Sequence, residues 1–306
     1  MPSSRRRFIA SSFGLAAALA SAGCISDGPG TDGESPDGSE PPQGSPDTTP
    51  TPAPESAQRS VGGASVAVTD IVAEKAVTYE SVMGSGGVVA PEGRQFVVAS
   101  VRSDAELEMD QFSLDAGGES WAAVDPGDHG ARNYSVAGHE GGVVGEPATG
   151  GSDTKRYVVF ELDSPLETEE ARIVLDHGSE TAEWALPDAA RERLAAPSPS
   201  FDLNSLSVPG SVQQGEPLPV ELTVTNTGEV DGRFLAAAHW PTHRIADDDE
   251  SHLIDESVAA GDSVTASLSI DTEYTAAEES PITLGVEGHV EADREVVLDG
   301  GTETPQ

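Results

Sequence analysis

The chain has 306 residues, and its 54 acidic residues outnumber its 16 lysines and arginines, which gives a formal net charge of −38. No basic patch is present that could neutralise phosphates, so this composition argues against a nucleic-acid-binding function, and we expect no nucleic-acid partner. The acidic residues are spread along the whole chain, as in proteins adapted to molar salt, where salt screens the mutual repulsion of the charges. A surface that binds or buffers cations is the alternative interpretation.

The first 23 residues have the pattern of an export signal. Three arginines, Arg5, Arg6 and Arg7, precede an apolar stretch over residues 10–22. That stretch is too short to span a bilayer, which needs about 20 apolar residues. Paired arginines followed by an apolar residue resemble the motif that the twin-arginine export pathway reads. We therefore expect residues 1–23 to be a twin-arginine signal peptide.

Cys24 is the only cysteine of the chain and follows Ser21-Ala22-Gly23. These four residues resemble a lipobox, in which the cysteine is acylated and becomes the new N-terminus. We expect Cys24 to anchor the protein to the outer face of the cell membrane through a lipid. The alternative is a chance cysteine after an ordinary cleaved signal. With Cys24 lipidated, no cysteine is left for a disulfide, a blue-copper site or thiol catalysis.

Residues 24–60 are predicted to be a disordered tether. They are almost all Gly, Pro, Ser, Thr, Asp and Glu, with no large apolar residue after Ile25. Such a segment cannot bury enough surface to offset its chain entropy. A flexible coil of this length spans roughly 33 Å, which would hold folded domains clear of the membrane.

Ordered patterning begins near residue 61 and defines a first module over residues 61–196. Short runs rich in β-branched and aromatic residues are bounded by Gly, Pro, Asp and Ser, which predicts an antiparallel β-sandwich. The run at 95–101 indicates a more buried strand, and a short helix over 188–194 closes the module. The expected strands are 65–72, 95–101, 112–114, 121–124, 157–162, 171–175 and 181–186.

A glycine-rich insertion over residues 125–154 interrupts the first module. Loops of this length are either functional or disordered. The insertion contains Asn133-Tyr134-Ser135, an N-glycosylation sequon, which makes Asn133 a candidate glycosylation site. The alternative is an unmodified surface loop.

A second module is predicted over residues 200–298, followed by a disordered tail at 299–306. A glycine turn at 215–217 leads into a strand at 220–225, which stops at Asn226-Thr227-Gly228, residues that tolerate turn conformations. The further expected strands are 235–240, 253–258, 264–270, 282–290 and 295–298.

Both modules resemble known families. The Gly-Glu-Pro turn, the strand ending in Asn-Thr-Gly and the later run at 260–264 resemble CARDB-type domains. That resemblance implies a seven-stranded Ig-like fold that serves in adhesion or as a spacer. The first module is similar to telokin-like Ig domains of lipoproteins, the DUF4352 type, on residues 90–98, 112–115 and 157–160. Neither family implies a catalytic residue, and fold similarity alone is weak evidence of function.

The strongest candidate for chemistry is a histidine cluster in the second module. His239, His243 and His252 flank the four carboxylates of residues 247–250. Imidazoles and carboxylates are ligands for zinc and other divalent ions. The spacing matches no established motif, and the EF-hand pattern for calcium is missing. The alternative is a solvated acidic loop that joins two strands.

These observations predict an all-β protein with two Ig-like sandwiches behind a signal peptide and a tether. No nucleotide-binding or nucleophile motif is present, so we expect no enzyme activity and no cofactor. A hydrolase would need Ser, His and Asp brought together from distant strands. The leading hypothesis is a lipid-anchored surface protein that displays its modules to a protein or glycan partner, or uses them as spacers. The alternative is a metal- or solute-binding accessory lipoprotein that uses the segment from His239 to His252.

Overall fold

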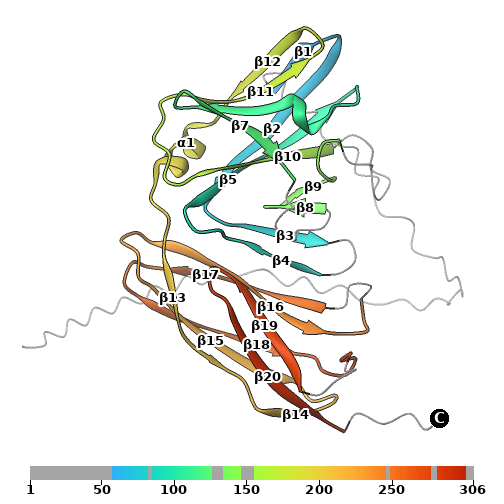
Figure 1. Cartoon of the computed structure of the whole chain (residues 1–306), viewed down its shortest axis with the longest axis vertical. Coiled ribbons are helices and arrows are strands. Elements are labelled where there is room, and N and C mark those ends of the chain that lie inside the picture. The colour runs from blue at the N-terminus through green and yellow to red at the C-terminus, as the bar shows by residue number, and fades with distance from the viewer. Residues whose placement is uncertain are drawn as a thin grey trace, which may run out of the picture. The chain divides into compact units, whose positions relative to one another are not determined.

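The computed structural model describes residues 57–81, 85–125, 134–145, 155–245, 249–276 and 281–300 (Figure 1). The chain is all-β, as predicted, with one α-helix among these residues. No helix in the described ranges is long and apolar enough to cross a membrane. Arg5, Arg6, Arg7, Cys24 and Asn133 lie outside the described residues, so the predictions that rest on them stay predictions.

The first module is built on one continuous sheet of eight strands in the order β1-β2-β5-β10-β7-β6-β11-β12. Strand β7 pairs with β10 on one side and with β6 on the other, so it joins the two layers of the predicted sandwich. The sheet begins inside the predicted tether, because Gln58–Val61 pairs with the next strand. The strands are β1 (Gln58–Val61), β2 (Ala64–Glu74), β5 (Arg94–Ser103), β6 (Phe112–Ala116), β7 (Glu119–Val124), β10 (Lys155–Asp163), β11 (Ala171–His177) and β12 (Glu180–Ala185).

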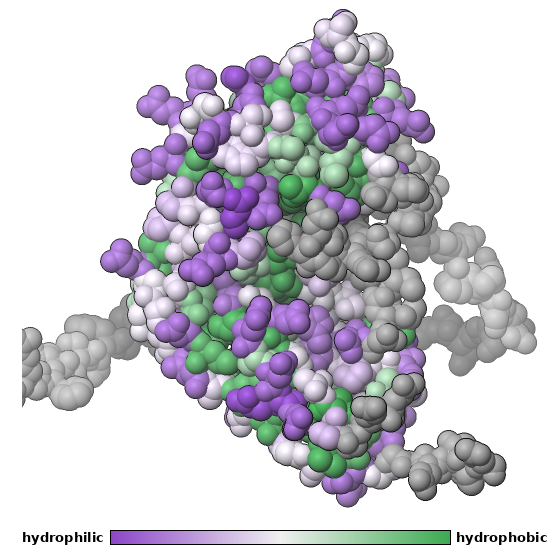
Figure 2. Space-filling model, viewed as in Figure 1, coloured by the Kyte–Doolittle hydropathy of each residue, from purple (hydrophilic) through white to green (hydrophobic). Residues whose placement is uncertain are grey.

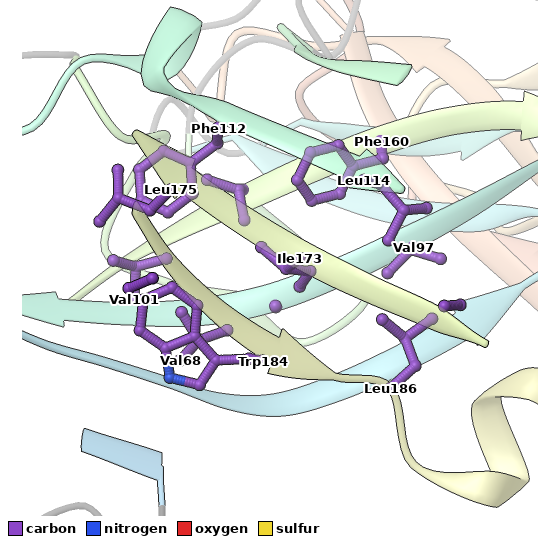
Figure 3. Packing of buried hydrophobic residues seen from close by; sticks show 14 of the residues in the cluster. Val68, Val97, Val101, Phe112, Leu114, Phe160, Ile173, Leu175, Trp184 and Leu186 are labelled. Carbon is purple, nitrogen blue, oxygen red and sulfur yellow. The ribbon is translucent and has the colours of Figure 1, made fainter. Parts of the chain in front are cut away.

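The main core of the first module lies between the two halves of this sheet. Side chains of β2, β5 and β10 pack against those of β6, β11 and β12 (Figure 3). Ile173 and Phe160 are fully buried there, and Trp184 is 4% exposed. The indole of Trp184 donates a hydrogen bond to the backbone oxygen of Ala57 at 2.6 Å. Helix α1 (Asp188–Ala195) follows β12 and adds Ala190 and Leu194 to the same core.

A second, smaller sheet covers the outer face of β5 and β10. Its order is β4-β3-β8-β9, and it encloses Phe96, Val98 and Tyr157. Strands β5 and β10 are therefore buried on both faces, which explains the nearly unbroken apolar run at 95–101. Part of the predicted loop insertion is thus a structural layer of the module. The strands are β3 (Val77–Ser81), β4 (Gly86–Val89), β8 (Tyr134–Val136) and β9 (His139–Glu140).

The second module is a sandwich of two sheets, ordered β13-β15-β18 and β14-β20-β19-β16-β17. Strand β14 runs parallel to β20, whereas the other pairs are antiparallel. Strands β13 and β14 were not predicted, and β20 extends to Asp299 inside the predicted tail. The strands are β13 (Phe201–Ser207), β14 (Ser211–Gln213), β15 (Leu218–Asn226), β16 (Gly232–Pro241), β17 (Asp249–Val258), β18 (Ser263–Ile270), β19 (Ile282–Gly288) and β20 (Ala292–Asp299).

The core of the second module is separate from both cores of the first. It contains only residues from Phe201 onward, whereas the first module's cores end at Leu194. Alternation along β15 produces it, since Leu218, Val220, Leu222 and Val224 point inward while the intervening residues do not.

Candidate functional site

The three histidines that the sequence singled out do not converge on one point. His239 and His252 lie in the paired strands β16 and β17, not in the predicted loop, which spans only the residues between Pro241 and Asp249. His252 pairs with Ala238, a core residue, so it projects from the core face of the sheet. Neighbouring residues of a strand point to opposite faces, so His239 projects from the other face. His243 is exposed beyond the end of β16.

Two polar atoms beside the core of the second module lack hydrogen-bond partners. Glu250 Oε2 and His252 Nε2 are both buried and unpaired. Burial lowers the pKa of His252, and His239 acts in the same direction, whereas Glu250 opposes them. Within the described ranges, no group of three or more His, Cys, Asp or Glu side chains is arranged to hold a metal ion. The predicted set of His239, His243 and His252 is therefore not assembled as a metal centre.

His139, which lies in the described part of the insertion, holds two segments of the first module together. His139 is 5% exposed, and its Nε2 lies 2.6 Å from the backbone oxygen of Asp70. Asp70 has a positive φ of 51° at a break in the β2–β5 register. His139 thus connects the small sheet to an irregular point in β2.

A charged groove lies on the outer face of the first module. It has a volume of about 1220 Å³ and lies over the ends of β6, β11 and β12. Figure 2 shows many hydrophilic side chains at the end of the molecule where Figure 1 draws β11 and β12. Seven carboxylates and three guanidinium groups line it, which leaves a net charge of −4. The lining residues are Arg59, Asp115–Ser120, Glu167–Arg172, Glu183, Ala185, Leu186, Asp188 and Arg191.

The floor of the charged groove is the outer face of three neighbouring strands. Arg172 is paired with Asp115 on one side and Ala185 on the other, so their side chains form one row across the sheet. Arg172 Nε lies 3.9 Å from Asp115 Oδ2 and 3.6 Å from Glu183 Oε2. The alternating pattern of β11 places Ile173 in the core and Arg172 in the groove.

The walls of the charged groove are fixed by hydrogen bonds between segments. The backbone N–H of Gly117, in the turn between β6 and β7, donates to Thr168 Oγ1 at 3.1 Å. The guanidinium of Arg191 donates to the backbone oxygen of Glu169 and to the carboxylate of Asp188. These contacts join the loop before β11 to the β6–β7 turn and to the first turn of α1, so the groove is built from connected segments.

Sequence reasoning missed this groove. Asp115 lies far along the chain from Arg172 and Glu183, and the strand register brings the three side chains together. An arginine at an outward position of an alternating strand is an ordinary surface residue in the sequence, so no local pattern distinguishes Arg172.

Comparisons with known proteins do not place the chain in a family. No protein-family model matches it, and no curated protein matches it. Among solved structures, a β-glucosidase from Listeria innocua in complex with glucose is 17% identical over 34% of this chain and 17% of its own, with a TM-score of 0.29. A DUF4785 family protein from Legionella pneumophila is 12% identical over 78% of this chain and 57% of its own, with a TM-score of 0.24. The matched segments thus span less than two thirds of those chains, and similarities this weak support no functional assignment.

Proposed function

We propose that this protein is a non-enzymatic, lipid-anchored cell-surface protein that displays two β-sandwich modules for interaction with a partner. The sequence supports the anchor, because the twin arginines, the lipobox at Cys24 and the polar tether occur in the order that an exported lipoprotein requires. The diffuse charge of −38 supports an environment of high salt.

The observation that carries the display function is the charged groove. It is open, it lies on the outer face of a well-packed sheet, and its walls are connected by hydrogen bonds. A rigid sandwich with an open polar surface is suited to holding a macromolecular partner, because little conformational freedom is lost on binding. Protein and glycan partners are both consistent with this proposal.

Cell fractionation tests the anchor and the display together. Wild-type protein and the Cys24→Ser and Arg5→Lys/Arg6→Lys variants are produced in a host with twin-arginine export. We expect wild type in the membrane fraction and cleaved by protease added to intact cells, Cys24→Ser in the medium, and the double lysine variant inside the cell. Membrane retention of Cys24→Ser at the wild-type level would disprove the lipid anchor, and protection of the wild type from protease would disprove display.

A further inference from the structure

Arg172 has hydrogen-bonding capacity that the protein does not use. Its Nε is buried without a hydrogen-bond partner, and its two ion-pair distances, 3.6 and 3.9 Å, are too long for hydrogen bonds. Among the described residues it donates no hydrogen bond, although its side chain is 41% exposed. The Nε is therefore covered by the protein, and only the remaining guanidinium donors of this partly exposed side chain can face the charged groove.

Other arginines of the chain show what a satisfied pair looks like. Arg233 binds both carboxylate oxygens of Asp255, at 2.7 and 2.6 Å. Arg94 lies 2.8 Å from Glu161, and Arg244 lies 2.9 Å from Asp271. Arg172 has two carboxylates within 4 Å but forms a hydrogen bond with neither of them. Its exposed guanidinium donors therefore stay available to an incoming group.

The surroundings of Arg172 leave room for that group and define its neighbours. On the β12 side the facing residue is Ala185, whose methyl group covers little of the guanidinium. The rim of the groove is acidic, with Glu167, Glu169 and Glu170 on one wall. A ligand that matches this pattern carries one carboxylate at its centre, for the Arg172 fork, and cationic groups beside it, for the rim.

The groove favours a polypeptide over a glycan. Sugar rings are held in open grooves largely by stacking on aromatic side chains, and no aromatic residue is among those that line this groove. A peptide supplies both signs of charge at the spacing of neighbouring side chains. Direct ion pairs with hydrogen bonds also persist in salt better than long-range attraction does.

We propose that the charged groove binds a lysine- or arginine-rich segment of a partner protein, with a carboxylate of that segment seated on the guanidinium of Arg172. This inference rests on the proposed function and specifies its partner. The carboxylate accepts two hydrogen bonds, one from each terminal amino group of the guanidinium, while basic side chains on either side pair with the acidic rim.

A peptide titration tests the proposal on the full-length mature protein in detergent and molar potassium chloride. The probe is a fluorescent peptide with one aspartate between lysines, and its matched control has asparagine at that position. We expect wild type to bind the aspartate peptide about tenfold more tightly than the asparagine peptide. Arg172→Gln should lose that preference, whereas Arg233→Gln, a matched arginine outside the groove, should keep it. Thermal unfolding establishes that each variant is folded.

Three results would overturn the proposal. They are binding of neither peptide, equal binding of both by wild type, and an unchanged preference in Arg172→Gln. Binding of an oligosaccharide panel that depends on Arg172, with no peptide binding, would assign the groove to glycans instead. Each of these leaves surface display intact, because cleavage of the wild type by protease added to intact cells decides display independently.

Discussion

Lys75 Nζ donates a hydrogen bond to Gln95 Oε1 at 2.6 Å inside the first module. The same amine donates to Ser164 Oγ at 3.0 Å and to the backbone oxygen of Leu194 at 3.3 Å. All three acceptors are neutral, and the side chain is buried, so no carboxylate compensates a charge there. Burial, and secondarily the positive charge of Arg193, lowers the pKa of Lys75 from 10.5 to about 8. Lys75 thus connects the corner between β2 and β3 with β5 and the end of α1. Burying the positive charge of its amine is unfavourable, which is why its pKa is lowered.

This arrangement predicts that stability rises with pH above neutrality. Between about pH 8 and 10.5 the unfolded chain keeps the Lys75 proton while the folded chain loses it, so the free energy of unfolding increases across that window. Chemical denaturation midpoints measured from pH 7 to 10 should therefore rise for wild type. Lys75→Met removes the titrating group, so its midpoints should show a smaller rise. The same pH dependence in both proteins would assign the effect to other groups.

The second module should lose stability on acidification. His289 Nδ1 accepts a hydrogen bond from the Leu235 N–H at 2.9 Å, and its ring lies 4.9 Å from that of Phe201. Burial lowers the pKa of His289, so the unfolded chain takes up a proton before the folded chain as the pH falls below about 6.5. The melting temperature should fall between pH 7 and pH 5.

His289→Asn tests this account, because asparagine keeps an acceptor near Leu235 but does not titrate. The variant should be less stable than wild type at pH 7, since it lacks the ring contacts, and should lose less stability on going to pH 5. His243→Asn, at an exposed position, serves as the control and should behave as wild type. An unchanged pH dependence in His289→Asn would contradict the assignment to His289.

The sequence predicted the strands that carry strong patterns, and the structure explains why others were missed. The runs at 95–101 and 220–225 are dense in β-branched residues, and both are central strands. Strands β4, β8 and β9 are short, and β4 starts with two glycines, so propensity could not identify them. They exist because the outer face of β5 and β10 supplies an apolar surface for Val89 and Val136.

The candidate sites were less predictable than the fold, for a physical reason. Close spacing in sequence suggested that His239 and His252 act together, but the strand register sends them to opposite faces of the sheet. In contrast, Asp115 and Arg172 are distant in sequence and adjacent in the sheet. Side-chain convergence in a β-sandwich depends on register, which local patterns do not fix.

In the described part of the insertion, replacement of Gly141 by alanine should destabilise the protein more than replacement of the adjacent Gly142. Gly141 has a φ of 103°, and a Cβ there would lie 1.9 Å from the backbone oxygen of Lys155. Gly142 has a φ of 83° with nothing within 4 Å of a Cβ. Gly142→Ala should therefore cost about 1 kcal/mol, the usual cost of a positive φ. Gly141→Ala should cost clearly more, because backbone must move as well.

Chemical denaturation of the two variants, with limited proteolysis of the insertion, measures the difference. Gly141→Ala displaces the segment that accepts a hydrogen bond from Arg156 Nη1 at 2.8 Å, so cleavage within residues 134–145 should accelerate. Gly142→Ala should be cleaved at nearly the wild-type rate. Equal cleavage of the two variants would mean that the insertion is not held against β10 as described.

Asn226 should be the least replaceable polar residue of the second module. It is fully buried, and its Nδ2 donates to the backbone oxygens of Val230 at 2.8 Å and Val258 at 3.0 Å, while its Oδ1 accepts from the Gly228 N–H. Asn226→Ala leaves these backbone groups unpaired and should cost about 2–3 kcal/mol of unfolding free energy. Asn226→Asp should cost more, because a carboxylate oxygen would face two carbonyl oxygens.

The control is Asn204→Ala, which removes only an exposed hydrogen bond with Thr225 and should change stability by less than about 0.5 kcal/mol. Denaturation at neutral pH measures all three, and a loss in Asn226→Ala no larger than in Asn204→Ala would show that this buried side chain does not hold the end of β15 in place.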